Sequence, residues 1–150
     1  MKYLLDTNVY LRATRSARHR EEFKRSFFPL LPVTMLSAVV IYELSVDAAT
    51  RATRVALAEF VEPMVQAGRL VTPTYETWER AAAVVSRIHA REPDRRSKLP
   101  ALLNDVLIAL SARQIGAAVV TFNREDFELI RRHAVFELRV QTDELQGPGK

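Results

Sequence analysis

The sequence of 150 residues contains no cysteine. This absence excludes disulfide bonds, cysteine-ligated zinc, iron–sulfur clusters and thiol nucleophiles. No apolar run approaches the roughly 20 residues that a membrane-spanning helix needs. The first residues also lack the basic and apolar segments of a secretory signal. We therefore expect a cytoplasmic protein with no membrane partner.

Histidine is also scarce. The chain has three histidines, His19, His89 and His133, and their spacing is not that of metal ligands. Each falls in a segment that is expected to be helix or loop, where a surface position is the ordinary outcome. The sequence therefore disfavours a histidine-based ribonuclease.

What is present indicates one globular domain with a basic surface. The chain is 48% hydrophobic and 27% charged, which is ordinary for a folded domain of this length. Lys and Arg number 22 against 18 Asp and Glu, for a formal net charge of +4. This excess weakly favours a polyanionic partner, either nucleic acid or an acidic protein segment. An ordinary basic surface explains the charge equally well.

Short apolar segments alternate with longer amphipathic ones along the whole chain. This alternation predicts an α/β fold with a parallel sheet covered by helices on both faces. The polar stretch 91–98 is expected to be an exposed loop, and residues 141–150 a flexible tail after a domain spanning 1–140. The expected strands are 2–5, 33–36, 70–72, 117–122 and 136–140. The expected helices are 17–28, 38–48, 50–67, about 74–92, 100–115 and a short one after 123–127.

Three acidic residues interrupt the most apolar segments. Asp6 ends the first strand, whereas Glu43 and Asp105 lie within helical segments that are otherwise apolar. Each has a structural explanation: Asp6 could cap a helix, Glu43 could be exposed or paired with an arginine, and Asp105 could stabilise a first helical turn. Acids are rarely buried without a partner, and oxygen ligands suit Mg²⁺ or Mn²⁺. Together the three acids therefore favour a divalent metal site.

A fourth polar region follows the expected strand 117–122. Asn123 comes directly after it, and Asp126 lies three residues further on. Either residue could cap the short helix that follows. Because this strand also ends at the sheet edge, either could equally face the three acids, and capping does not exclude that role.

These segments together resemble the PIN-domain ribonucleases, most of all the VapC toxins of prokaryotic toxin–antitoxin pairs. The resemblance rests on Leu-Leu-Asp-Thr-Asn-Val, mid-helix Glu43, Leu-Asn-Asp-Val-Leu-Ile-Ala-Leu and Val-Val-Thr-Phe-Asn-Arg-Glu-Asp-Phe, and it covers 2–140. It implies a three-layer α/β/α sandwich with a short, mostly parallel sheet. It also implies an endoribonuclease dependent on Mg²⁺ or Mn²⁺.

The resemblance further implies a role for each site residue. Asp6, Glu43 and Asp105 would be catalytic metal ligands, with Asp126 as a further catalytic acid near them. The supporting polar groups would be Thr7, Asn8, Thr121 and Asn123. Arginines near these motifs would contact RNA phosphates; the candidates are Arg12, Arg15, Arg95 and Arg96.

Partners also follow from the resemblance. It implies a homodimer and a VapB-like antitoxin whose tail wraps the toxin and places an Arg or Lys at the acidic site. Phe23, Phe27, Phe28 and Leu30 could line a groove for that tail, and could equally belong to the core.

Three other functions remain open. A phosphatase of the haloacid-dehalogenase type would use Asp6 as nucleophile, but it needs a second Asp where this chain has Asn8. A PIN fold that binds RNA or a partner without catalysis would require a broken acidic set, and here the set is complete. A PIN nuclease in RNA processing, outside a toxin–antitoxin pair, is compatible with every motif.

Overall fold

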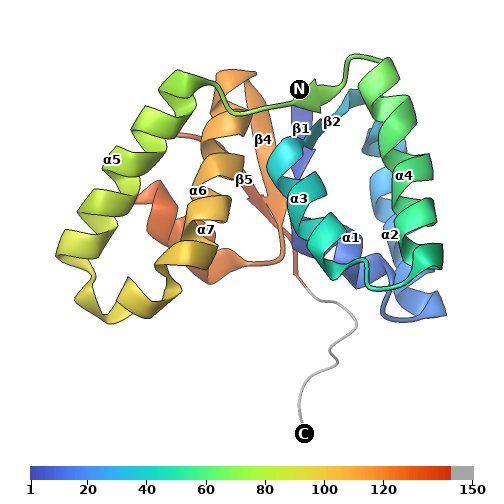
Figure 1. Cartoon of the computed structure of the whole chain (residues 1–150), viewed down its shortest axis with the longest axis horizontal. Helices are drawn as coiled ribbons and strands as arrows, with labels where there is room; N and C mark the ends of the chain where they lie inside the picture. The colour runs from blue at the N-terminus through green and yellow to red at the C-terminus, as the bar shows by residue number, and fades with distance from the viewer. Residues whose placement is uncertain (143–150) are drawn as a thin grey trace, which may run out of the picture.

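The computed structural model of the chain describes residues 1–142, so most of the expected tail lies outside the described part. Five strands form one parallel sheet in the order β3-β2-β1-β4-β5 (Figure 1). The first strand is therefore central, as expected for a short apolar strand buried on both faces. The strands are β1 Lys2–Leu5, β2 Thr34–Ser37, β3 Leu70–Val71, β4 Ala117–Thr121 and β5 Glu137–Val140.

Helices connect all the strands. Seven α-helices and two 3₁₀ segments lie within residues 1–142. They are α1 Thr7–Ala13, α2 Ala17–Phe27, η1 Phe28–Val33, α3 Ala38–Asp47, α4 Arg51–Gln66, α5 Tyr75–Arg91, η2 Pro93–Lys98, α6 Leu99–Gln114 and α7 Arg124–Arg131. In this part of the chain no helix is long and apolar enough to cross a membrane.

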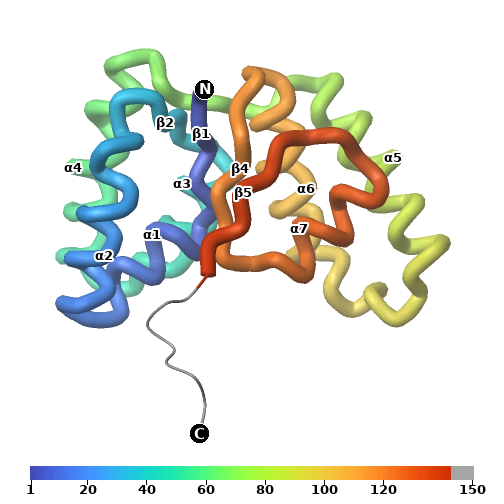
Figure 2. Tube along the Cα trace, turned by 180° about the vertical axis from the view of Figure 1, so that it is seen from behind, coloured from blue at the N-terminus to red at the C-terminus, as the bar shows by residue number. Residues whose placement is uncertain are grey.

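The sheet separates two apolar cores, which confirms the expected three-layer α/β arrangement. On one face, α3 to α7 pack over Leu4, Leu36 and Val119. On the other face, α1, α2 and η1 cover Tyr3, Leu5 and their neighbours on β4. Figure 2 shows this second face, with α1 and α2 on the side of the sheet formed by β1 and β2. Successive residues of β1 thus serve opposite cores, as the period of a strand requires.

The structure adds elements that the sequence pattern did not indicate. Residues 7–13 form the helix α1, which is too short to show a clear hydrophobic period. The stretch 93–98, expected to be an irregular loop, is the 3₁₀ segment η2. Residues 28–33 likewise form a 3₁₀ turn, because the two prolines in Phe-Pro-Leu-Leu-Pro-Val prevent α2 from continuing.

Phe127 anchors α7 to the larger core and is a sensitive test of it. Its side chain is fully buried and packs edge-on against Phe136, with ring centroids 6.4 Å apart. Phe127→Ala should lower the free energy of unfolding by about 3–5 kcal/mol, because it removes a buried ring and leaves a cavity. Urea denaturation measures this loss. Val135→Ala, at a side chain that is 79% exposed, is the control and should change stability by less than about 0.5 kcal/mol; equal effects would contradict the assignment of Phe127 to the core.

Candidate active site

The pairing of β1 with β4 places the first acid. Leu5 lies opposite Val120 in the parallel ladder, and the Asp6 N–H extends it by donating to the Val120 carbonyl over 2.9 Å. Asp6 is only 4% exposed. One carboxylate oxygen accepts from the Thr7 N–H at 2.7 Å and the other from the Thr121 hydroxyl at 2.7 Å. The expected capping role of Asp6 is thus confirmed, and it fixes the carboxylate at the sheet edge.

Thr121 is the centre of a polar network at this edge. Besides donating to Asp6, its hydroxyl accepts from Asn8 Nδ2 at 3.2 Å and from the Asn123 N–H at 2.9 Å. Asn8 Oδ1 accepts in turn from the Phe122 N–H. These bonds connect the start of α1 to the end of β4, so the side chains of Thr121 and Asn8 each have more than one hydrogen-bond partner.

Glu43 reaches the same place from α3. This helix begins directly after β2, where the Ser37 side chain accepts from the Val39 N–H. The Thr7 hydroxyl donates to Glu43 Oε2, and Asn104 Nδ2 donates to Oε1 over 3.1 Å. Glu43 is partly exposed rather than enclosed. Within residues 1–142 it has no ion pair, so the structure does not support the alternative of an arginine partner.

Asp105 lies on α6, and of the three acids it is the one without a hydrogen-bond donor among residues 1–142. It is the seventh residue of a helix that begins at Leu99, so the explanation by first-turn dipole stabilisation is wrong. No described residue donates a hydrogen bond to it. Burial, and after it the nearby carboxylates of Asp6, Asp126 and Glu43, together raise the pKa of Asp105 from 3.8 to about 8. Without a cation, this carboxyl is therefore largely protonated at neutral pH.

Asp6 responds to the same surroundings less strongly. Its pKa rises from 3.8 to about 6, mainly because of burial. The hydrogen bonds from Thr121 and Thr7 lower this pKa, and the charges of Glu43 and Asp126 contribute to the rise. Residues far apart in sequence thus form one repulsive cluster, as the distribution of acids predicted.

Asp126 and Asn123 take different places in this cluster. Asn123 lines the cavity between the acids, and its side chain caps α7 by accepting from the Asp126 N–H at 3.3 Å. Its Nδ2 donates to Asp126 Oδ2 over 2.9 Å. Asp126 itself does not line the cavity, yet its charge raises the pKa of both Asp6 and Asp105.

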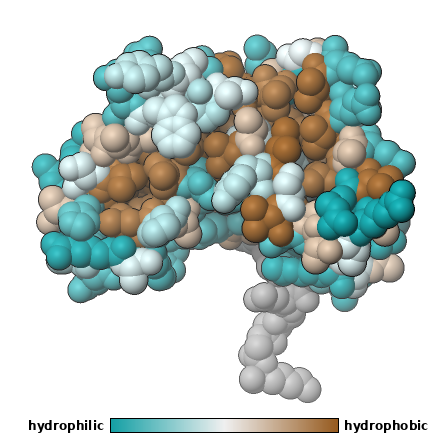
Figure 3. Space-filling model, in the orientation of Figure 1, coloured by the Kyte–Doolittle hydropathy of each residue, from teal (hydrophilic) through white to brown (hydrophobic). Residues whose placement is uncertain are grey.

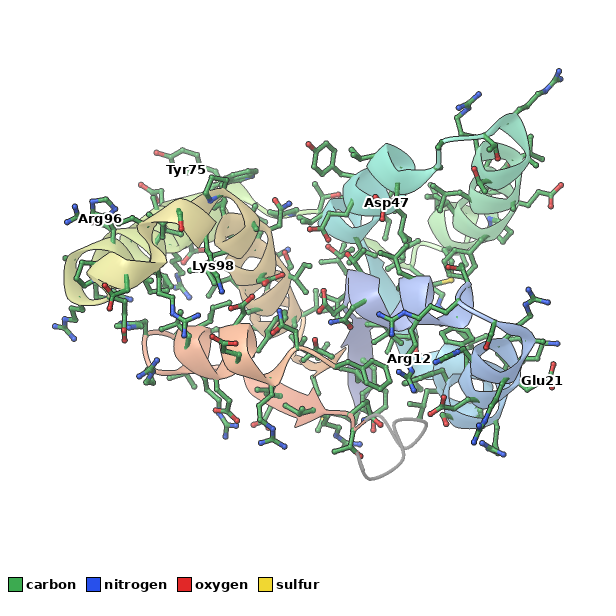
Figure 4. The ribbon with its side chains drawn as sticks, turned by 90° about the horizontal axis from the view of Figure 1, so that it is seen from below. Arg12, Glu21, Asp47, Tyr75, Arg96 and Lys98 are labelled. Atoms are coloured by element: carbon green, nitrogen blue, oxygen red, sulfur yellow. The ribbon has the colours of Figure 1, made fainter. Side chains whose placement is uncertain are left out.

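The acids open onto one cavity of about 460 Å³ at the carboxyl ends of the strands. Figure 4 views this end of the molecule, with Asp47 on the α3 side and Lys98 on the α6 side. The pattern of acids did not identify several lining residues, namely Leu11, Tyr42, Val46, Asp47 and Asn104. Two of them had a usable signal: Asn104 is a polar residue in the same apolar helical segment as Asp105, and Asp47 follows Glu43 by one helical turn on α3.

The donor set fits a hard divalent cation in its chemistry. It consists of carboxylate and amide oxygens, and burial together with mutual repulsion raises the pKa of Asp6 and Asp105, so a cation there would be stabilised. Among residues 1–142, no three His, Asp or Glu side chains lie close enough together to hold one ion directly. Magnesium usually keeps several waters and takes one or two carboxylates, so such a cavity suits it without complete enclosure by protein.

The four arginines expected at RNA phosphates differ in position. Arg12 is only 6% exposed, pairs with Glu22 at 3.1 Å and lies over the Phe122 ring, so it is not available at the surface. Arg15 is exposed. Arg95 pairs with Glu125 at 2.6 Å beside the acidic cluster. Arg96 lies at the outer edge of the molecule, away from the cavity (Figure 4).

The aromatic residues of α2 mainly belong to the core. Phe27 is buried in the smaller core, and Phe23 and Leu30 pack against it. Only Phe28 is strongly exposed, at 51%. Of the two interpretations of these residues, the structure thus supports core packing for all but Phe28.

Comparisons with known proteins agree with this geometry. The model of the PIN domain family matches residues 3–132. No curated protein sequence matches the chain. Among solved structures, VapBC2 from Rickettsia felis bound to a promoter DNA fragment is 18% identical, with a TM-score of 0.64, and the match covers 95% of this chain and 100% of that one.

Two further structures are similar to the same extent. VapBC from Salmonella typhimurium bound to DNA is 20% identical, with a TM-score of 0.60 over 93% of this chain and 98% of that one. VapBC-1 from nontypeable Haemophilus influenzae is 21% identical, with a TM-score of 0.60 over the same shares. At these identities the likeness establishes the fold.

The raised pKa values predict how stability depends on pH without metal. The folded state holds more protons than the unfolded state between about pH 4 and pH 8, because the pKa values of Asp6 and Asp105 lie at about 6 and 8 instead of 3.8. The free energy of unfolding should therefore fall as pH rises through this window. Asp105→Asn should remove much of the slope and be about 1–3 kcal/mol more stable than wild type at pH 8.5.

Urea denaturation in chelator from pH 5 to 8.5 measures this slope. The matched control is Asp94→Asn, at an exposed position in η2, which should keep the wild-type dependence. A wild-type slope in Asp105→Asn would contradict the assignment of the excess protons to Asp105.

Proposed function

The chain belongs to the PIN domain family, and from this membership we propose that it is an endoribonuclease dependent on Mg²⁺ or Mn²⁺ and acts as the toxin of a toxin–antitoxin pair. One observation carries the proposal: buried Asp6 and partly buried Glu43 and Asp105 share a cavity, and no Lys or Arg of residues 1–142 forms an ion pair with them. A cation from outside the described residues would neutralise these carboxylates.

The side chains divide the work of the reaction. Asp6 and Glu43 would hold a cation, because hydrogen bonds from Thr7 fix both and further bonds from Thr121 and Asn104 complete their orientation. When bound, the divalent ion supplies charge neutralisation for the carboxylates and the phosphate.

Asp105 is the group best placed to take a proton. No described side chain or backbone N–H donates a hydrogen bond to its carboxylate, which lines the cavity. A bound cation would favour the ionised form of this carboxylate and so leave it able to accept a proton. We assign it the role of orienting the attacking water and accepting its proton. In-line attack on the phosphate would leave a 5′-phosphate and a 3′-hydroxyl.

RNA would be held first through its backbone. Arg15 and Arg95 are the better candidates among the arginines near the motifs, because Arg12 is buried and Arg96 lies away from the cavity. Such contacts bind phosphates without selecting sequence. Arg95 would have to exchange its bond to Glu125 for one to phosphate.

The proposed toxin role includes two protein partners. A cognate, VapB-like antitoxin would place a Lys or Arg among the carboxylates and so compete with the metal. A second copy of the chain would cover exposed apolar residues, including Tyr42, Val46, Tyr75 and Trp78, which are 47–79% exposed. Figure 3 shows several apolar patches on the face of the molecule seen in Figure 1. The structures of VapBC complexes support the antitoxin partner by analogy.

Cleavage of RNA by the purified protein tests the function. Wild-type protein should cut a mixed RNA pool that includes transfer RNAs in Mg²⁺ or Mn²⁺ and not in chelator. Asp6→Asn should reduce the rate at least about a hundredfold, because it removes a charged ligand from the cavity. End-labelling of the products should detect 5′-phosphates.

Two controls make this result specific. Glu59→Gln on the exposed side of α4 changes the charge equally and should cut like wild type. Thermal melts should show that Asp6→Asn remains folded. Absence of cutting by folded wild-type protein, free of antitoxin and at every metal concentration, would contradict the nuclease proposal and favour a binding role.

A further inference from the structure

A second hollow, here called the arginine hollow, lies between α5, α6 and the end of α7. Its volume is about 250 Å³, and none of its lining residues lines the acidic cavity. Arg80 and Arg87 come from α5, Arg113 from α6, and His133 from the turn after α7. The apolar lining consists of Ala83, Val84, Leu110 and Ala134.

The positive charge of this hollow is only partly compensated. Arg80 pairs with Glu76 at 2.7 Å, but both side chains are at least half exposed. Arg87 donates to the His133 carbonyl over 2.8 Å and so has a neutral partner. Arg113 makes no ion pair or side-chain hydrogen bond with residues 1–142. Two of the three arginines that line the hollow therefore have no carboxylate partner among the described residues.

His133 lies near several of these positive charges, and its pKa is lowered. Burial lowers its pKa, and the charges of Arg91, Arg87 and Arg132 lower it further, against a smaller opposite effect of Glu92. The imidazole is therefore neutral at pH 7. Its Nε2 is buried and has no hydrogen-bond partner among the described residues. The hollow thus combines two arginines that lack a carboxylate partner with a lining histidine whose Nε2 is buried.

Arginine is the side chain best suited to bind phosphate oxygens, because its planar fork donates two parallel hydrogen bonds. Here the forks come from two helices that pack along their length, so their spacing is set by the fold. We propose that the arginine hollow binds a backbone phosphate of RNA at a distance from the bond that is cut. This inference rests on the proposed ribonuclease function.

The position of the hollow determines what it would contribute. Arg113 follows Asp105 by eight residues on α6, or about 12 Å along the helix axis, and faces about 80° away from it. A strand cut at the acidic cavity would therefore reach the hollow only with a phosphate several nucleotides away. Such a contact is equal in the ground state and the transition state, so it lowers KM without changing kcat.

Binding of RNA in chelator tests the hollow separately from the chemistry. The probe is a 5′-labelled single-stranded RNA 20-mer, and fluorescence anisotropy gives Kd across a series of salt concentrations. Arg113→Gln should weaken Kd about three- to tenfold and reduce the salt slope by about 0.7, the value for one phosphate contact with a single strand. In metal, KM for cleavage of the same RNA should rise while kcat stays constant.

Arg51→Gln, at the exposed first residue of α4, is the matched control and should retain wild-type Kd and slope. Thermal melts verify folding of both variants. Equal RNA binding by the two variants would overturn the inference and leave the ribonuclease proposal intact. Wild-type protein that binds no RNA would overturn both.

A second measurement distinguishes the sources of phosphate. The imidazole resonances of His133 should shift when the RNA 20-mer is added and not when inorganic phosphate is added at the same concentration. An equal shift with inorganic phosphate would show a site for small anions and would overturn the assignment to RNA.

Discussion

The parallel pairing of β1 with β4 is the constraint on which the acidic site depends. It brings Asp6 beside Thr121, 115 residues later in the chain, and lets the Thr121 hydroxyl donate to the carboxylate. The same register forces Tyr3 and Leu5 into one core and Leu4 into the other. A shift by one residue would exchange the cores and remove the acid from the edge. Packing and chemistry are therefore specified by one ladder.

This constraint produces a site that opposes the stability of the fold. Like charges and burial disfavour ionised Asp6 and Asp105, as their pKa values of about 6 and 8 show. The surrounding hydrogen bonds compensate unequally, because Asp6 has two donors and Asp105 has none. The fold thus keeps one carboxylate rigid and leaves another free to exchange a proton. Structural carboxylates seldom combine in this way, whereas catalytic ones often do.

Much of this organisation could be predicted from the sequence, because apolar runs report buried strands and helices directly. The three acids were recognisable since each interrupts such a run. The helix α1 could not be predicted, because seven residues give too short a pattern. Arg12 lies on this helix, so its burial could not be predicted either. The arginine hollow had no signal at all: Arg80, Arg87 and Arg113 meet only because α5 packs on α6.

The distribution of charge connects these features. A chain with a net charge of +4 places acids in a cavity at the strand ends and arginines on the outer faces of helices. A polyanion is attracted over a long range by the whole molecule, yet repelled locally where the cavity is negative. A cation in the cavity removes that repulsion. A divalent ion would do so and leave room for a phosphate, whereas a Lys or Arg of a partner would do so and occupy the space. The same uncompensated negative charge of the cavity would therefore allow both the proposed activity and its inhibition.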